Sequence, residues 1–324
     1  MSTVETALGA VDTADLGPTL SHEHLFINLM LERRGDGLVH EEQLVVDELQ
    51  VFADQGGGTI FDLTTAELTP GSTTASKPTF TATAAGETRD PENVAAIQRV
   101  SRATGVNVVL GAGRYRDPFM SRDLIDRLGV DGIAEEIIRD LTEGIPGTGV
   151  KAGIIGEIGA DKWFVSATEE RSFRGAARAS VATGVPVYTH AARWHVGLDQ
   201  VALLRHEGVD PAKIVVGHVD TVPTPGFAVE LASTGVYIGL DTINSKNPAA
   251  VAPRVAQVLE LVRAGYLERI LLSHDVCVVS HLRAYGGNGF GFVLEGFRHA
   301  LLEAGISAEE FDTMIRANPA RLLG

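Results

Sequence analysis

Two histidines separated by one residue lie near the start of the chain, in the stretch TLSHEHLF at residues 19–26. The stretch reads as a short β-strand. Successive side chains of a strand point to opposite faces, so His22 and His24 should point the same way. Two imidazoles on one face, at one end of a strand, can bind one metal ion together. The pair therefore predicts a metal site to which other segments bring further ligands.

Four more side chains that can bind a metal end later predicted strands, namely Glu157, His190, His218 and Asp275. Glu157 and His190 are 33 residues apart, and His190 and His218 are 28 apart, each about one strand–helix unit of roughly 30 residues. Asp275 follows His218 by 57 residues, or two such units, so we expect the seventh strand to contribute no ligand. The spacing predicts that these strand ends meet at a common edge.

Four histidines and two carboxylates suit two adjacent divalent ions, because a single catalytic zinc commonly uses three protein ligands. Glu157 is placed to bridge the two ions, and a hydroxide between them would be the nucleophile. Asp275 would bind one ion and take a proton from the bridging water. A single strand-end histidine is more often a hydrogen-bonded structural residue than a ligand, so the prediction depends on all six residues together.

The polar residues beside these ligands have other expected roles. Ser273, His274 and Asp275 are consecutive in a strand, so their side chains cannot converge as a hydrolase triad requires, and His274 is expected to be structural. Glu23 should point away from the ions and pair with a helix. Cys277 is expected to be a small buried residue near the rim.

These ligands need a scaffold that brings the ends of distant strands together. Eight short apolar segments alternate with helical periodicity, which favours a closed (β/α)₈ TIM barrel over an open doubly wound sheet. An open sheet would more often have a glycine fingerprint after its first strand, where this chain has His-x-His. The site should then lie at the C-terminal ends of the strands. The predicted strands cover residues 19–26, 59–63, 106–110, 152–157, 186–190, 213–218, 236–240 and 269–275, and the predicted helices cover 41–53, 92–104, 131–143, 169–183, 195–206, 226–233, 248–264, 292–304 and 308–323.

Length and composition agree with one large domain over residues 1–324, since 44% of the residues are apolar and can form a sizeable core. The net charge of −15 disfavours nucleic acids and anionic membranes as partners. One cysteine, no signal-peptide pattern and no membrane-length apolar run lead us to expect a cytoplasmic protein. Residues 64–90 have no periodicity and are expected to form a loop insertion over the active site. Barrels covered by helices often associate, so a homodimer is one possible oligomeric state.

Several motifs make the expectation more specific, and together they span nearly the whole chain. They are LGPTLSHEHL (residues 16–25), KAGIIGEIG (151–159), TGVPVYTH (183–190), VGHVD (216–220), LLSHD (271–275) and NPAR (318–321). With these motifs the sequence resembles the phosphotriesterase family of the amidohydrolase superfamily. The resemblance implies a (β/α)₈ barrel with two divalent metal ions, usually zinc, with Mn²⁺ or Co²⁺ as alternatives.

The resemblance also implies how the ligands divide between the ions. Carried across, it assigns His22, His24 and Asp275 to the more buried ion. It assigns His190 and His218 to the more exposed one.

The fourth strand departs from the pattern of most characterised members, which bridge the ions with a carboxylated lysine. Here that strand ends in Glu157, and Lys151 lies at its start. The chain therefore resembles the phosphotriesterase-homology branch, in which a glutamate is the bridge. A plain carboxylate has a shorter arm than a carboxylated lysine, so the spacing of the ions should differ.

Four residues are candidates for substrate binding. Tyr115 matches a tyrosine that some lactonases of the family aim at the substrate carbonyl, with an ordinary aromatic residue at the rim as the alternative. Trp163, Arg193 and Arg283 are further candidates, together with the glycine-rich loop at residues 286–291.

Two functions are compatible with this set of residues. The first is a metal-dependent hydrolase that acts on an ester bond of a small molecule. A carboxylic ester or lactone is the preferred substrate, and a phosphotriester would be a promiscuous one. The second is a non-catalytic small-molecule binding protein on the same barrel, since a fold does not fix a function. A protein that only binds would be expected to lack at least one ligand, whereas all six are present.

Overall fold

The structure is a computed structural model that describes residues 2–69, 89–160 and 162–324. Most of the expected insertion at residues 64–90 falls on residues 70–88, outside the described part of the chain. The insertion therefore stays a prediction from the sequence.

Eight parallel strands form one sheet in the described part of the chain, and each strand neighbours the next one along the sequence. The first and last strands also meet, because the Asp275 N–H lies 3.2 Å from the His22 carbonyl oxygen and the His22 N–H lies 3.0 Å from Ser273 Oγ. The predicted (β/α)₈ architecture is thereby confirmed. The strands are β3 (Thr19–Glu23), β6 (Thr59–Asp62), β7 (Asn107–Ala112), β8 (Ile154–Gly159), β9 (Val187–His190), β10 (Ile214–Gly217), β11 (Tyr237–Leu240) and β12 (Ile270–Leu272).

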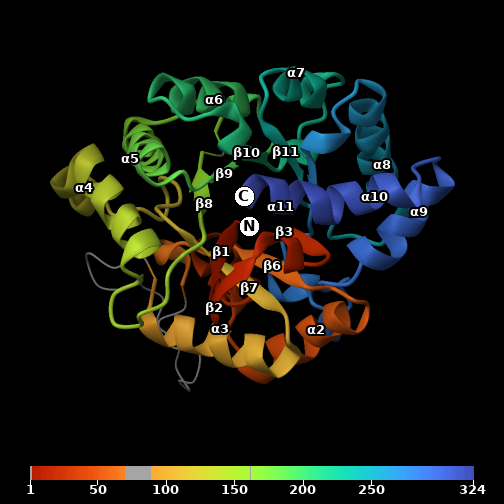
Figure 1. The fold of residues 1–324 in the computed structure, drawn as a ribbon, viewed down its shortest axis with the longest axis horizontal. Helices are drawn as coiled ribbons and strands as arrows, with labels where there is room; N and C mark the ends of the chain where they lie inside the picture. Colours follow the sequence, from red (N-terminus) through yellow and green to blue (C-terminus); the bar gives the residue numbers. More distant parts are fainter. Residues whose placement is uncertain (1, 70–88, 161) are drawn as a thin grey trace.

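Helices surround the strands, and both chain ends lie near the centre of the view in Figure 1. The longer helices follow the predicted order. They are α2 (Glu42–Asp54), α3 (Pro91–Thr104), α4 (Arg122–Thr142), α5 (Ala167–Thr183), α6 (Val196–His206), α7 (Phe227–Ser233) and α8 (Pro248–Arg263). Shorter ones are α1 (Met30–Arg33), α9 (Arg298–Glu303), α10 (Ala308–Asp312) and α11 (Asn318–Leu323), with π-helical turns at Val293–Phe297 and Thr313–Ala317.

Local sequence signals set the helix ends. Asp90 caps α3 by accepting a hydrogen bond from the Glu92 N–H. A reciprocal capping box between Ser166 and Glu169 begins α5. Helix α4 begins nine residues before the predicted start at Asp131, because Ser121 caps an earlier turn. Gly129, at φ 62°, joins this turn to the predicted helix, so periodicity alone revealed only the second half.

Two apolar layers hold the strands in place. One layer lies between the strands and the surrounding helices, and the other fills the barrel interior. Tyr188 and Tyr237 have exposed fractions of 0% and 1%, so the barrel is a packed core rather than a pore. The interior cluster is Val4, Leu16, Phe61, Leu63, Val109, Ile154, Tyr188, Val215, Tyr237, Leu271 and Leu322.

An unpredicted hairpin at the N-terminus contributes to this interior. It consists of β1 (Thr3–Thr6) and β2 (Gly9–Asp12), which pair antiparallel. Val4 of the hairpin and Leu322 of α11 belong to the interior cluster, so both chain ends close one end of the barrel. A second small pair, β4 (Ile27–Asn28) with β5 (Leu38–Val39), follows the first barrel strand. Among the described residues, no helix is both long and apolar enough to cross a membrane.

Candidate metal centre

The two histidines of the opening motif lie side by side at the end of β3, with ring centroids 5.3 Å apart. The register of β3 against β6 shifts between Leu20 and Glu23, which interrupts simple alternation. Leu20 packs in the outer apolar layer, whereas the His22 ring contacts Tyr188 of the interior. The irregular register is therefore what places His22 inside the barrel.

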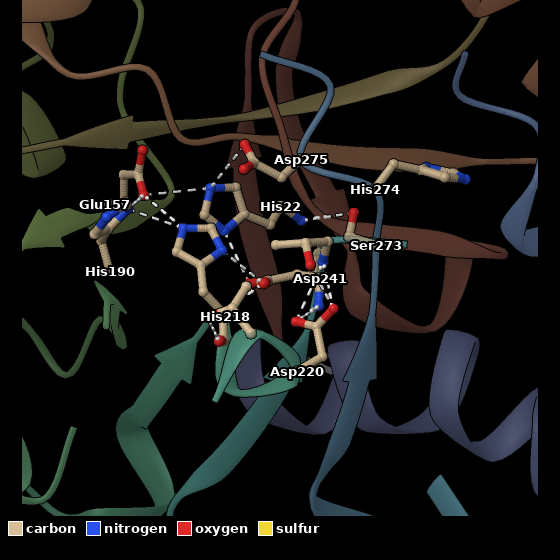
Figure 2. A network of polar contacts seen from close by, with 12 residues as sticks. His22, Glu157, His190, His218, Asp220, Asp241, Ser273, His274 and Asp275 are labelled. Carbon is tan, nitrogen blue, oxygen red and sulfur yellow. Dashed lines mark hydrogen bonds and ion pairs between the residues drawn. The ribbon is translucent and has the colours of Figure 1, made fainter. Parts of the chain in front are cut away.

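Glu157 contacts several histidines at once, and Figure 2 shows its carboxylate beside His22, His190 and His218. One carboxylate oxygen, Oε2, lies 3.0 Å from His190 Nδ1, 3.4 Å from His22 Nε2 and 3.5 Å from His218 Nε2. The other oxygen, Oε1, lies 3.5 Å from His24 Nε2. Both oxygens of the Glu157 carboxylate therefore face imidazoles. The residue is only 2% exposed, so these contacts are nearly closed to solvent.

Asp275 and His218 complete the group from short turns just beyond their strands. Both have left-handed backbone conformations, with φ 52° at Asp275 and 58° at His218, which are uncommon for residues other than glycine. Asp275 Oδ1 lies 3.3 Å from His24 Nε2 and 3.9 Å from His22 Nε2. The strained turns direct both side chains at the residues of β3 and β8.

The donor atoms fit divalent metal ions. His22, His24 and Glu157 form one group of donors within 4.8 Å of one another, and Glu157, His190 and His218 form a second. Glu157 is common to both groups, as a bridging ligand must be. Imidazole nitrogens with carboxylate oxygens are the donors that zinc and similar ions use. The buried His22 Nε2 makes no hydrogen bond among the described residues, and it faces Glu157 Oε2 at 3.4 Å and Asp275 Oδ1 at 3.9 Å, the carboxylates that would share an ion with it.

Asp241, which the sequence analysis missed, lies directly behind two of these histidines. Its Oδ2 is 3.0 Å from His22 Nδ1, and its Oδ1 is 2.8 Å from His218 Nδ1 and 2.7 Å from the His218 N–H. The Tyr188 hydroxyl donates to Oδ2 at 2.7 Å. Asp241 follows β11, the strand expected to contribute nothing. A carboxylate at the end of this apolar strand was the available signal.

Charges inside the site shift the protonation of its members. Burial disfavours an imidazolium, but the carboxylates of Glu157 and Asp241 raise the pKa of His22 to about 10. Burial would raise the pKa of Asp275, yet the neighbouring histidines lower it to about 2. The pKa of Glu157 is also lowered well below its usual value by the histidines that face it. Both carboxylates are therefore held in the ionised form that binds metal.

Further contacts hold the remaining ligands. The Thr64 hydroxyl lies 2.9 Å from His24 Nδ1, and a partner on one ring nitrogen orients the other nitrogen toward a metal. The Tyr115 hydroxyl lies 3.2 Å from His190 Nδ1, the nitrogen that also faces Glu157 at 3.0 Å. Burial raises the pKa of Tyr115 well above its usual value, so its hydroxyl keeps its proton and can donate it in a hydrogen bond.

The expected partner of Glu23 was wrong, because Glu23 pairs with the segment after β12 rather than with a helix. Its Oε1 accepts hydrogen bonds from Ser273 Oγ at 2.7 Å and from the His274 N–H at 2.9 Å, and its Oε2 accepts from the Val276 N–H at 2.9 Å. The reason is barrel closure, which brings the first strand against the last. His274 Nε2 accepts the Val293 N–H at 2.8 Å, in keeping with its expected structural role.

A cavity of about 380 Å³ opens above the site. Tyr115 and Arg193 line it, as the sequence analysis expected. The structure does not bring Trp163 or Arg283 into this lining. Trp163 is 71% exposed and stacks edge-on against Phe164, while the backbone N–H of Arg283 is bound to Glu48.

Two further lining residues follow Asp275 in the chain, on the loop after β12. Cys277 lines the cavity near the rim and is half-buried rather than buried as expected. His281 also lines the cavity, and its Nδ1 lies 3.1 Å from the Asp275 carbonyl oxygen. His281 ends no strand and belongs to no motif, so nothing in the sequence had pointed to it.

The sequence model of the Phosphotriesterase family matches residues 2–77 and 79–323, so the chain belongs to the phosphotriesterase family. It is 31% identical to the phosphotriesterase homology protein of Escherichia coli (strain K12), covering 94% of this chain and 97% of that protein. It is 27% identical to the N-acetyltaurine hydrolase of Danio rerio, covering 99% and 97% respectively. These matches confirm the resemblance that the motifs indicated.

Solved structures lead to the same family. The crystal structure of the E. coli phosphotriesterase homology protein, complexed with phosphate in its active site, has a TM-score of 0.83 and 30% identity, covering 96% of this chain and 99% of that one. A resiniferatoxin-binding protein from Rhodobacter sphaeroides has a TM-score of 0.86 and 30% identity, covering 99% and 95%.

Proposed function

We propose that the protein is a metal-dependent hydrolase that cleaves a carboxylic ester or lactone, with phosphotriesters as secondary substrates. The observation that supports this most directly is the position of Glu157. Its two oxygens face four histidines, which lie at the ends of β3, β9 and β10. Such a carboxylate suits a bridge between two ions, because one oxygen faces His24 and the other faces His190 and His218.

In the proposed assignment, His22, His24 and Asp275 hold one ion, His190 and His218 hold the other, and Glu157 binds both. Two divalent ions, zinc by expectation, would supply an activated water and polarise the substrate oxygen. Asp275 accepts the proton of the attacking water. Its pKa of about 2 keeps it ionised at neutral pH, and its 17% exposed side chain reaches the cavity.

Tyr115 is the proposed substrate contact. Its hydroxyl lies in the cavity beside His190 and keeps its proton, so it can donate a hydrogen bond to the substrate carbonyl. Relatives named N-acetyltaurine hydrolase act on an amide, which extends the proposed substrates to carboxylic amides. The similarity to a resiniferatoxin-binding protein supports the alternative function, in which the protein binds a small molecule without cleaving it.

The decisive experiment measures metal content and turnover together. Wild type, Asp275→Asn and the surface control Asp47→Asn would be stripped of metal and reloaded with zinc, manganese or cobalt. They would then be screened with lactones, aryl esters, N-acyl amides and phosphoesters. We expect two equivalents of metal and turnover in wild type and control, and a loss of about 100- to 10,000-fold in Asp275→Asn.

Three outcomes separate the alternatives. Retained turnover in Asp275→Asn would contradict its role as proton acceptor. Loss of metal in that variant would show that Asp275 acts mainly as a metal ligand rather than as a proton acceptor. Wild type with fewer than two equivalents of metal and no turnover would favour the binding protein.

A further inference from the structure

Four arginines line the same cavity as the metal ligands. They come from four separate segments, namely α1 for Arg33, the loop after β7 for Arg116, the loop after β9 for Arg193, and α8 for Arg254. We call these four residues the arginine wall. In a chain with a net charge of −15, such a concentration of guanidinium groups around one small cavity requires an explanation.

Arg254 is held in a fixed orientation. Its Nε donates to Asp220 Oδ2 at 2.8 Å, one terminal nitrogen donates to the Ala250 carbonyl at 2.9 Å, and the other donates to Thr242 Oγ1 at 2.7 Å. These bonds use three of the five N–H groups of a guanidinium, and each terminal nitrogen keeps one. The side chain is 19% exposed and lines the cavity, so a pre-oriented pair of donors is accessible to a ligand.

Arg116 and Arg33 differ in their pairing. Arg116 is nearly buried, binds both carboxylate oxygens of Glu32, and lies over the Tyr115 ring at 5.0 Å. Arg33 is exposed at the cavity, and no described carboxylate lies within ion-pair distance of it. Arg33 therefore contributes a positive charge that no described acid neutralises.

Arg193 reaches the cavity from an unusual backbone conformation. Its φ is 71°, and its N–H donates to Thr221 Oγ1 at 2.7 Å, so the turn that carries it is fixed. A left-handed conformation at a residue with a long side chain is uncommon and is found most often where function demands it.

The charge of the lining follows from these residues. The four arginines face three lining carboxylates, those of Glu32, Glu157 and Asp275, and Asp220 pairs with Arg254 from outside the lining. The arginines and these carboxylates therefore nearly balance. Two divalent ions would add four positive charges, so with both bound the cavity would be a positive region in an acidic molecule and would attract an anion rather than a neutral ligand.

We infer that the substrate carries a fixed oxyanion away from the bond that is cleaved, and that the arginine wall binds it. This inference rests on the proposed hydrolase function and names its substrate class. The reacting carbonyl lies at the metal ligands, the anion lies at Arg254 and Arg33, and a cavity of about 380 Å³ accommodates a small molecule that spans both. Carboxylate, sulfonate and phosphate share the required chemistry.

The first test compares matched substrates. Each pair is an ester, lactone or amide with either a distal carboxylate or the corresponding carboxamide, assayed with metal-loaded enzyme. We expect kcat/KM to be at least about tenfold higher for the anion, and Arg254→Gln and Arg33→Gln to remove most of this preference. Arg263→Gln, an exposed arginine at the end of α8, is the control and should leave the preference unchanged. Sulfonate and phosphonate analogues identify the preferred anion.

The second test needs no turnover. Titration calorimetry on the metal-loaded protein compares glutarate with its monoamide, which has one carboxylate fewer. Tighter binding of glutarate by about tenfold, lost in Arg33→Gln, supports the arginine wall. Arg33 is exposed and has no ion-pair partner in the described chain, so its replacement should not impair folding.

The outcomes distinguish this inference from the proposed function. Equal kcat/KM and equal affinity for the charged and neutral members would overturn the inference, while metal-dependent turnover of the neutral substrates would leave the hydrolase intact. Absence of all turnover, with glutarate still preferred in an Arg33-dependent way, would reject the hydrolase and keep the oxyanion site.

Discussion

Asp241 contacts two histidines of the candidate metal centre with one carboxylate. Its oxygens lie 3.0 Å from His22 Nδ1 and 2.8 Å from His218 Nδ1. Each of these histidines belongs to one of the two donor groups that contain Glu157, and the two histidines form a third group with Asp241 itself. A partner of this kind orients the ring and increases the basicity of the coordinating nitrogen. Asp241 is therefore placed to influence both metal sites at once.

Replacing Asp241 with asparagine tests this coupling. The amide cannot accept a hydrogen bond from both imidazoles, so we expect the affinity for each of the two ions to fall by about 10- to 100-fold. Competition with a chromogenic chelator measures both affinities, and Asp47→Asn on the exposed face of α2 is the control. A loss confined to one ion would show that the two histidines are held independently.

A substitution at Tyr115 can test substrate binding separately from metal binding. Its hydroxyl is 3.2 Å from His190 Nδ1, but Glu157 and His218 face the same nitrogen at 3.0 and 2.9 Å. We expect Tyr115→Phe to keep its metal content and to lose about 10- to 100-fold in kcat/KM, because one donor to the substrate oxygen is removed. Unchanged kinetics would leave Tyr115 as an ordinary aromatic residue of the rim.

The junction between α4 and β8 contains a carboxyl group whose charge opposes folding. Asp140 is fully buried near the end of α4, and its Oδ2 has no hydrogen-bond partner among the described residues. Arg139 contacts the other oxygen at 3.0 Å. Burial nevertheless raises the pKa of Asp140 to about 7. An unfolded aspartic acid titrates near 3.9, so the folded state binds more protons than the unfolded state between about pH 4 and pH 7.

The sign of the effect follows from this difference. Stability from the neutral Asp140 is fully present below about pH 4 and is lost as the pH rises through about 7. We expect Asp140→Asn to gain roughly 2–4 kcal/mol in free energy of unfolding relative to wild type between pH 4 and pH 8. Urea unfolding across this range measures the gain, with exposed Asp131→Asn as the control. A difference independent of pH would mean that Asp140 titrates normally.

The barrel as a whole is organised around donors from distant parts of the chain. The candidate ligands lie at the ends of β3, β8, β9, β10 and β12, so bound ions would tie five strands together. The same ends are crowded with buried charges, which the histidines and carboxylates neutralise for one another. Metal should therefore contribute to the stability of the entire fold.

Removal of metal tests this contribution. Ions present at about 1,000 times their dissociation constant stabilise a protein by about 4 kcal/mol. For a chain of this size we expect a chelator to lower Tm by about 10 °C, and added zinc to restore it. Scanning calorimetry with parallel metal analysis measures the shift. An unchanged Tm in protein that has demonstrably lost its metal would separate the ions from folding stability.

Local patterns along the chain were enough to predict the barrel and the family. Strand and helix positions follow from local periodicity, caps and glycines, which act over a few residues, and eight apolar segments in alternation leave few architectures. The same pattern pointed to the six candidate ligands, because each was predicted to end a strand and such ends meet in a parallel barrel. In the structure Glu157 lies within β8 and Asp275 follows β12 by three residues, and their donor atoms still lie together with the histidines.

The surroundings of those ligands, in contrast, depend on contacts between segments far apart in the chain. Asp241 acts on histidines that are 219 and 23 residues away, and Glu23 binds a segment about 250 residues away, so no local pattern reveals either contact. The shift in β3 that turns His22 inward is likewise a property of strand pairing. Side chains on loops, such as Trp163 and Arg193, face outward or inward according to packing rather than to periodicity. Long-range contacts therefore set the surroundings of the site, while short-range patterns set the scaffold.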